Sequence, residues 1–251
     1  MSEPKLFAFT CNWCSYAGAD LAGVSRLQYP PHIRIIRVMC SGRIDPYFLI
    51  EALRLGADGV LVTGCHPADC HYISGNYNAR YKILFVKKLL EKIGINPDRI
   101  MLEWISASEA EKFRNTMTNY SELTSKLGPI SLESKEKLEQ ELEIIQAICA
   151  DFNFRWLVGK SRQLIELGNV YNETMPEEEY IELIDKIIDA EIVRQRIIHS
   201  IRDEPKTAID IAEDLTIPTE LIMKHLLALK TKQKVQLVMV GHDAKFAVIE
   251  D

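Results

Sequence analysis

Three apolar segments near the start of this sequence each end at a cysteine. The run KLFAFT is followed by Cys11 and Cys14, the run IRIIRVM by Cys40, and the run GVLVTG by Cys65 and then Cys70. Near-continuous apolar runs of this length are typical of strands that are covered on both faces, as in parallel sheets. The repetition predicts that thiols gather where the strands of one sheet end.

Residues 5 to about 105 alternate strand and helix patterns. Strands are predicted at 5–10, 33–39, 59–63 and 99–105, and helices at 17–27, 45–55 and 77–93. The second helix has clear ends, because Asp45 and Pro46 suit its first positions and Gly56 suits a left-handed C-terminal cap. With right-handed crossovers, this β-α-β-α-β-α-β order predicts an α/β fold with a flavodoxin-like open parallel sheet.

The loops after parallel strands open at one edge of the sheet, and in flavodoxin-like order the first strand lies between the second and the third. Neighbouring strands are about 4.8 Å apart, so these three strand ends span only about 10 Å. We therefore expect the five cysteines to converge on one crevice.

The composition indicates a cytoplasmic protein. Of its 251 residues, 47% are apolar and 26% charged. The N-terminus is not basic, and no segment approaches the roughly 18 uninterrupted apolar residues that a membrane helix needs. Because cytoplasmic thiols are usually reduced, metal or redox chemistry explains the cysteines better than structural disulfides do.

Soft thiolates select zinc, copper(I) or iron–sulfur clusters. Zinc needs four ligands and commonly uses two C-x2-C pairs, whereas this sequence has C-x2-C, a lone cysteine and C-x4-C. A [2Fe–2S] cluster also needs four ligands but tolerates uneven spacing, and a dithiol redox pair is a third interpretation. Four of the five cysteines are expected to be ligands.

Hydrogen bonds and nearby charges tune the potential of a cluster, so the neighbours of the cysteines matter. For each histidine among them, an ordinary surface position is the simpler interpretation. The glycines would expose backbone N–H groups to sulfur, and the larger side chains would line the rim. These neighbours are Trp13, Gly42, Arg43, Gly64, His66, His71 and Tyr72. No catalytic acid–base pair is evident.

The middle of the chain, from Leu132 to about Asp203, is predicted to be helical with a break at 172–176. Net charge is +3 for residues 1–130, −8 for 131–189 and −1 for 190–251. The acidic segment is most simply a solvated helical face. Cys149 lies on an apolar stripe there, where a buried inert thiol is expected.

Residues 190–251 are predicted to form a separate winged helix-turn-helix domain. Helices at 191–202, 208–215 and 219–230 are followed by strands at 236–240 and 245–249. Such folds often read DNA through the third helix. The near-neutral charge disfavours nucleic-acid binding and favours protein docking or dimerisation.

Several long motifs resemble a known family, the iron–sulfur (delta) subunit of methyl-viologen-reducing [NiFe] hydrogenase. They are CNWCSYAGAD, VMCSGRIDP, GADGVLVTGCHPADCHYISGNYNA and EWISASEAEKF, and the resemblance covers roughly residues 5–120. It implies a non-catalytic [2Fe–2S] subunit that relays electrons from a hydrogenase or formate dehydrogenase to the A-type flavoprotein of heterodisulfide reductase. There the electrons would enter flavin-based electron bifurcation, part of anaerobic metabolism.

The resemblance also implies that Cys11, Cys14, Cys40, Cys65 and Cys70 form the cluster-binding set. We therefore predict three parts: an iron–sulfur domain at 1–125, an acidic helical linker at 126–189 and the winged helix at 190–251. The expected function is electron transfer between the partners named above, or from a similar donor such as a methylenetetrahydrofolate reductase system. The alternative is an iron–sulfur or zinc redox-sensing transcriptional regulator that binds DNA with the winged helix.

Overall fold

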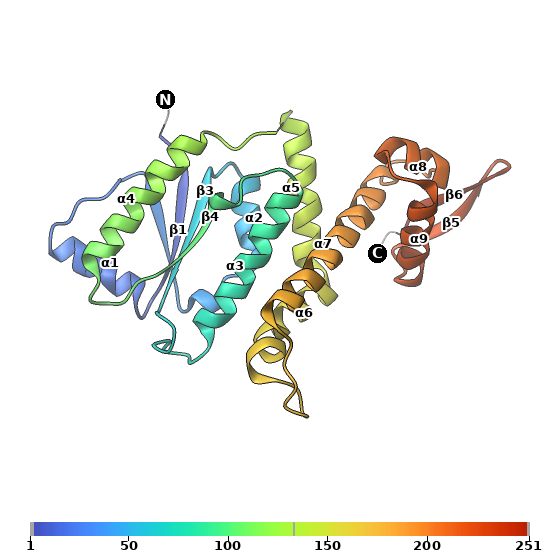
Figure 1. Cartoon of the computed structure of the whole chain (residues 1–251). Helices are drawn as coiled ribbons and strands as arrows, with labels where there is room; N and C mark the ends of the chain where they lie inside the picture. The colour runs from blue at the N-terminus through green and yellow to red at the C-terminus, as the bar shows by residue number, and fades with distance from the viewer. Residues whose placement is uncertain (1–2, 133, 250–251) are drawn as a thin grey trace. The chain divides into compact units, whose positions relative to one another are not determined.

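The computed structural model describes residues 3–132 and 134–249 (Figure 1). The predicted domains begin at residue 1 and end at residue 251, so their outermost residues lie outside the described range. The strands are β1 (Leu6–Cys11), β2 (Ile33–Val38), β3 (Gly59–Gly64), β4 (Ile100–Trp104), β5 (Val235–Val240) and β6 (Asp243–Val248). The helices are α1 (Ser15–Val24), α2 (Pro46–Arg54), α3 (Gly75–Lys92), α4 (Ala110–Leu127), α5 (Lys135–Ala150), α6 (Phe152–Arg162), α7 (Glu177–Ser200), α8 (Ala208–Leu215) and α9 (Thr219–Thr231).

The predicted parallel sheet is confirmed. Its strand order is β2-β1-β3-β4, so β1 lies between β2 and β3 as expected. In the register of β1, Cys11 pairs with Val38 and Thr10 pairs with Thr63. Cys40 and Cys65 each follow these partners by two residues. The three strand ends are therefore nearly level, and their cysteines leave the sheet at one edge.

Helices cover both faces of this sheet, with α1 and α4 on one face and α2 and α3 on the other (Figure 1). The first face is filled by apolar side chains from β1, β3, α1 and α4, including Leu6, Leu61, Ala22, Phe113 and Met117. Strand β3 is buried along its whole length, as a strand covered on both sides should be. The doubly wound layering explains why the inner strands β1 and β3 read as near-continuous apolar runs.

The ends of α2 follow the sequence signals. The Asp45 side chain accepts a hydrogen bond from the backbone N–H of Tyr47 (3.0 Å), and Pro46 occupies the first helical position. Gly56, just past the helix, has φ +93°. This left-handed backbone suits glycine, which has no β-carbon to clash.

Helix α4 is absent from the sequence-based predictions. Its buried positions, Ala110, Phe113, Met117, Tyr120 and Thr124, recur every three or four residues. The intervening residues are mostly polar, which hides the apolar stripe in the sequence. The Tyr120 hydroxyl donates to the carbonyl oxygen of Arg99 (2.6 Å), so even this buried polar group has a partner.

The helical middle differs from the prediction in two places. The helical region predicted from Leu132 has an earlier break at Asp151. This residue ends α5, and its carboxylate accepts the N–H groups of Asn153 and Phe154 at the start of α6. Helix α7 begins after the predicted 172–176 break but then runs unbroken through the predicted boundary at 189/190. No glycine or proline interrupts residues 177–200, so nothing in the backbone stops the helix there.

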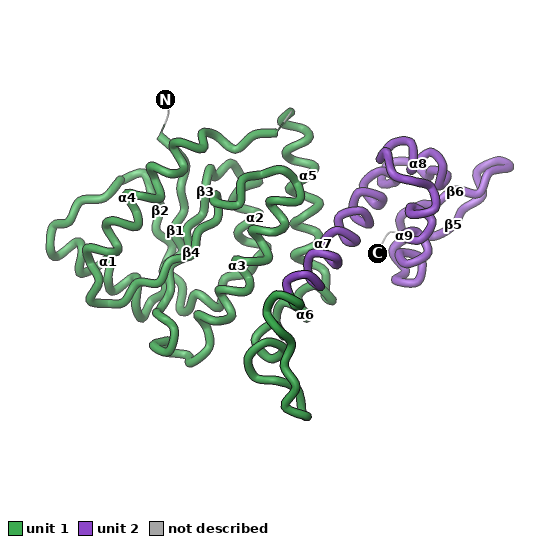
Figure 2. The backbone as a smooth tube through the Cα atoms, in the orientation of Figure 1, with its two compact units in different colours: residues 1–180 green, residues 181–251 purple. Residues whose placement is uncertain are grey.

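The chain forms two compact units, residues 1–180 and 181–251 (Figure 2). In the first, α5 packs on α2 and α6 on α3. In the second, α8, α9 and the antiparallel β5–β6 hairpin follow the predicted order around an apolar core. Whether this unit is a winged helix stays a prediction. Within the described ranges, every helix is too short or too polar to cross a membrane.

Candidate metal centre

All five cysteines of the N-terminal region come together at the carboxyl edge of the sheet. Cys11, Cys40, Cys65 and Cys70 form one buried cluster, and the half-buried Cys14 packs against it. Each of the four buried residues is at most 9% exposed. The convergence expected from the strand order is therefore seen, although the cysteines' role as ligands stays a prediction.

The sulfurs fall into a group of three and a pair. The sulfur atoms of Cys11, Cys14 and Cys65 all lie within 4.8 Å of one another, and Cys14 and Cys65 are joined as a disulfide. Cys11 Sγ lies 3.7 Å from Cys65 Sγ. Cys40 contacts Cys70. Burial, followed by the neighbouring thiols of Cys70 and Cys11, raises the pKa of the Cys40 thiol. A positive metal centre would favour the thiolate forms instead.

Two glycines let the loops that carry Cys40 and Cys70 approach closely. A β-carbon placed on Gly75 would collide with Cys40 Sγ and lie 3.3 Å from Cys70 Sγ. A β-carbon on Gly42 would lie 2.7 Å from the α-carbon of Gly75. The two sulfurs therefore occupy space that only glycine leaves free.

Two serine hydroxyls lie beside the thiols. Ser15 Oγ accepts the N–H of Cys11 (2.8 Å) and donates to the carbonyl oxygen of Thr63 (3.1 Å), which links the ends of β1 and β3. Ser41, next to Cys40, is 1% exposed, and its hydroxyl finds no hydrogen-bond partner among the described residues. A buried hydroxyl without an acceptor is costly, whereas a thiolate or inorganic sulfide would accept a hydrogen bond from it.

These observations fit an iron–sulfur cluster. A [2Fe–2S] cluster needs four cysteine thiolates, and the site gathers five. A Cys14–Cys65 disulfide leaves only Cys11, Cys40 and Cys70 free, which is one ligand too few. A cluster held by four of these five cysteines would therefore need Cys14, Cys65 or both as reduced thiolates.

Exposed aromatic side chains border the thiols. Trp13, between Cys11 and Cys14, stacks on the His71 ring with centroids 3.8 Å apart. Its indole N–H also donates to the Tyr72 hydroxyl (3.2 Å). Trp13 is 42% and Tyr72 46% exposed. These contacts join the first cysteine loop to the residues that follow Cys70 and leave an aromatic rim, Trp13, His71 and Tyr72, facing solvent.

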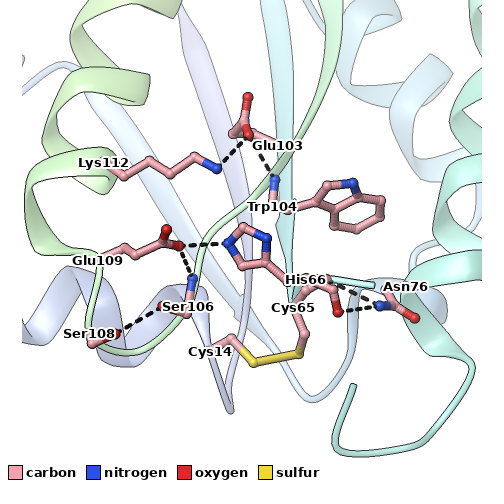
Figure 3. A network of polar contacts seen from close by, with 10 residues as sticks. All are labelled: Cys14, Cys65, His66, Asn76, Glu103, Trp104, Ser106, Ser108, Glu109 and Lys112. Atoms are coloured by element: carbon pink, nitrogen blue, oxygen red, sulfur yellow. Dashed lines mark hydrogen bonds and ion pairs between the residues drawn. A yellow bond between two sulfur atoms is a disulfide. The ribbon is translucent and has the colours of Figure 1, made fainter. Parts of the chain in front are cut away.

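His66, the residue after Cys65, is held by the start of α4 (Figure 3). Its Nε2 lies 2.7 Å from Glu109 Oε2, which also accepts the N–H of Ser106 (2.7 Å). This backbone bond, followed by the His66 contact, lowers the pKa of Glu109 to about 2. Asn76 donates to the carbonyl oxygens of Cys65 (3.3 Å) and His66 (2.7 Å). These contacts fix the backbone at Cys65.

The remaining predicted residues lie outside these networks. Arg43 is exposed at the end of a short 3₁₀ turn, Ser41–Arg43, and Cys149 is buried in α5. Burial raises the pKa of the Cys149 thiol, as expected for an inert cysteine. Sequence reasoning missed Ser15, Ser41, Gly75, Asn76 and Glu109. The two serines lie within four residues of a cysteine, and Gly75 and Asn76 lie within six residues of Cys70. This short distance to a cysteine is the one signal that marks these four residues in the sequence.

Comparison with known proteins covers this same region. Residues 6–128 match the family described as methyl-viologen-reducing hydrogenase, delta subunit. The chain is 52% identical over 139 residues to the D-type vhc iron-sulfur subunit of an F420-non-reducing hydrogenase from Methanococcus voltae, covering 55% of this chain and 96% of that protein. The corresponding D-type iron-sulfur subunit from Archaeoglobus profundus is 50% identical over 131 residues, covering 52% of this chain and 96% of its own length.

Another relative is much longer. The A-type subunit of ferredoxin:CoB-CoM heterodisulfide reductase from Methanosarcina mazei is 51% identical over 134 residues, which are 53% of this chain but only 17% of that protein. The family match ends at residue 128, before α5. Through its cysteine-bearing sheet, this chain belongs to the family of the delta subunit of methyl-viologen-reducing hydrogenase.

Proposed function

We propose that this protein is a cytoplasmic electron-transfer subunit that binds one [2Fe–2S] cluster. Four of Cys11, Cys14, Cys40, Cys65 and Cys70 would hold it. The observation that carries the proposal is the single buried cluster formed by these five cysteines. Relatives named iron-sulfur subunits match this region over nearly their whole length, which supports it.

When bound, such a cluster takes up and releases one electron. The protein's own groups would hold it, exclude water and set its potential. Little water reaches the buried thiols, and the free Ser41 hydroxyl is available to donate to sulfur. The exposed aromatic rim lies beside the thiols, where a partner's cofactor would have to come close.

We further propose that one partner is a flavin-containing, heterodisulfide reductase A-type protein. The support is the A-type relative from Methanosarcina mazei, in which a region 51% identical to this one is part of the same chain. A domain that is covalently joined to another in one protein is expected to lie beside it in a complex. The donor would be a hydrogenase, a formate dehydrogenase or a similar enzyme, and the electrons would feed flavin-based bifurcation.

Anaerobic purification tests this proposal. We expect a brown protein with two irons and two sulfides per chain, and a paramagnetic resonance signal of a [2Fe–2S] cluster after reduction. A flavoprotein and a dehydrogenase or hydrogenase should co-purify. A protein that contains zinc and no sulfide would overturn the cluster assignment. A protein that binds DNA and co-purifies with none of these partners would favour the redox-sensing transcriptional regulator.

The C-terminal unit is proposed to dock a partner protein. The near-neutral charge of residues 190–251 and their position outside the family match support this role over nucleic-acid binding. The named relatives give the redox-sensing regulator no support. Deleting residues 181–251 should leave the iron content unchanged and abolish co-purification of the donor. A truncated chain that still binds its donor would contradict the docking role.

A further inference from the structure

The loop that carries Cys40 is held from the side of α3. This loop, residues 40–45, connects β2 to α2. Lys82 Nζ donates to the carbonyl oxygens of Gly42 (2.7 Å) and Ile44 (3.2 Å). The Lys82 side chain is partly buried, and burial lowers its pKa. A buried ammonium is stable only when it is hydrogen-bonded, so Lys82 and the loop depend on each other.

Arg155 of α6 holds the end of the same loop. Its Nη2 lies 2.5 Å from Asp45 Oδ2 and its Nη1 3.1 Å from Asp45 Oδ1. Nη1 also donates to the carbonyl oxygen of Cys149 at the end of α5 (3.4 Å). A paired guanidinium–carboxylate contact restricts both distance and orientation. Arg155 lies beyond residue 128, so this contact comes from outside the family match.

The end of the loop borders a cavity. The cavity has a volume of about 220 Å³, and its lining includes Asp45, Lys82, Cys149 and Arg155. Each charged group among these already has a protein partner, so the cavity offers no free charge to a ligand. The position of the loop in turn decides where Cys40 Sγ lies against Gly75.

We propose that Lys82 and Arg155 are positioning residues that clamp the Cys40 loop, Lys82 from within the family region and Arg155 from the extension that follows it. The inference rests on the proposed function, since the loop matters if Cys40 serves the cluster. The Lys82 ammonium is also close enough to Cys40 for their charges to interact. A nearby positive charge favours the more negative reduced cluster and so raises its potential.

Four variants of the full chain test the clamp: Lys82→Met, Lys82→Arg, Arg155→Gln and, as a control, Arg80→Gln. Arg80 is a matched control, because its side chain is 50% exposed and that of Arg155 is 48% exposed. Like Arg155, Arg80 forms an ion pair with a distant carboxylate, that of Glu177 (2.7 Å). The Arg80 contact does not involve the Cys40 loop.

The first readout needs no cluster. In reduced apo-protein, the rate of Cys40 alkylation by iodoacetamide is measured by peptide mass spectrometry, and urea unfolding checks separately that each variant is folded. We expect Cys40 alkylation to rise several-fold in Lys82→Met and Arg155→Gln. It should be unchanged in Arg80→Gln and nearly restored in Lys82→Arg. If one of the variants Lys82→Met and Arg155→Gln is unfolded without urea, the other decides.

The second readout is the midpoint potential of the loaded protein, followed by visible absorbance. It should fall in Lys82→Met and stay near the wild-type value in Lys82→Arg and Arg80→Gln. Cys40 alkylation at the wild-type rate in both Lys82→Met and Arg155→Gln would overturn the clamp. If instead the wild-type protein binds no iron, the proposed function fails while the alkylation result still judges the clamp.

Discussion

The family region and the C-terminal unit differ in where their buried polar side chains lie. The family region buries polar groups such as Ser15, Ser41 and Asn76 beside the thiols. The core of the C-terminal unit is a cluster of aliphatic side chains from α7, α8, α9 and β5 closed by Phe246, and this unit also buries Glu191 and His225. Buried polar groups cost free energy unless they are paired, so a polar interior is retained where chemistry needs it. In the family region, the buried polar groups gather beside the five cysteines, which agrees with the site proposed there.

The strongest test of this contrast compares two buried cysteines. Cys11→Ser should lose most of its bound iron, because it removes one of the three sulfurs that lie within 4.8 Å of one another. Cys149→Ser should keep its iron, since Cys149 lies in α5 apart from the other cysteines. Iron and sulfide analysis after anaerobic purification measures both. Loss of iron in Cys149→Ser would show that the site has been misplaced.

Two glycine substitutions give the next largest difference. Gly75→Ala should lose most of its cluster, because the new methyl group would collide with Cys40 Sγ. Gly159→Ala, within α6, meets nothing within 4 Å and should stabilise the helix by about 0.5–1 kcal/mol. Iron content and the free energy of unfolding in urea measure the two effects. Full iron content in Gly75→Ala would contradict the steric argument.

The smallest effect concerns acid. Because the pKa of Glu109 is lowered from 4.5 to about 2, its contribution to folding is present above pH 4.5 and is lost as the pH falls toward 2. The side chain is 34% exposed, so solvent screening keeps this contribution below about 1 kcal/mol. Glu109→Gln should be less stable than wild type at pH 6, and the gap should close by about pH 2.5. Urea unfolding of the apo-protein at both pH values measures this difference in the free energy of unfolding. A difference that does not change with pH would assign the effect to packing.

Much of the sheet could be predicted because local signals and burial agree there. Near-continuous apolar runs, the Asp45–Pro46 start and Gly56 all indicate the same layered fold. Helix α4 was missed because polar residues interrupt its buried stripe. The boundary at 189/190 was predicted from the order of helices and strands after it, and helix α7 runs through this position because no glycine or proline ends it there.

The cysteines could be grouped from the sequence because strand order alone brings them to one edge. Their supports could not be found that way. Glu109 lies 43 residues from His66, and Lys82 lies 40 residues from Gly42. Such contacts depend on how helices are placed over the sheet, which no local pattern encodes. The cysteine pattern also left open which thiols pair, whereas the structure separates a group of three from a pair.

Gly42 and Gly75 bring two backbone segments into direct contact, and this contact sets the spacing between the sulfurs of Cys40 and Cys70. Neither position can accept even one extra carbon without pushing the other segment away. A designer who transplanted the Cys40 and Cys70 sulfurs into another scaffold would have to carry over these two backbone segments together.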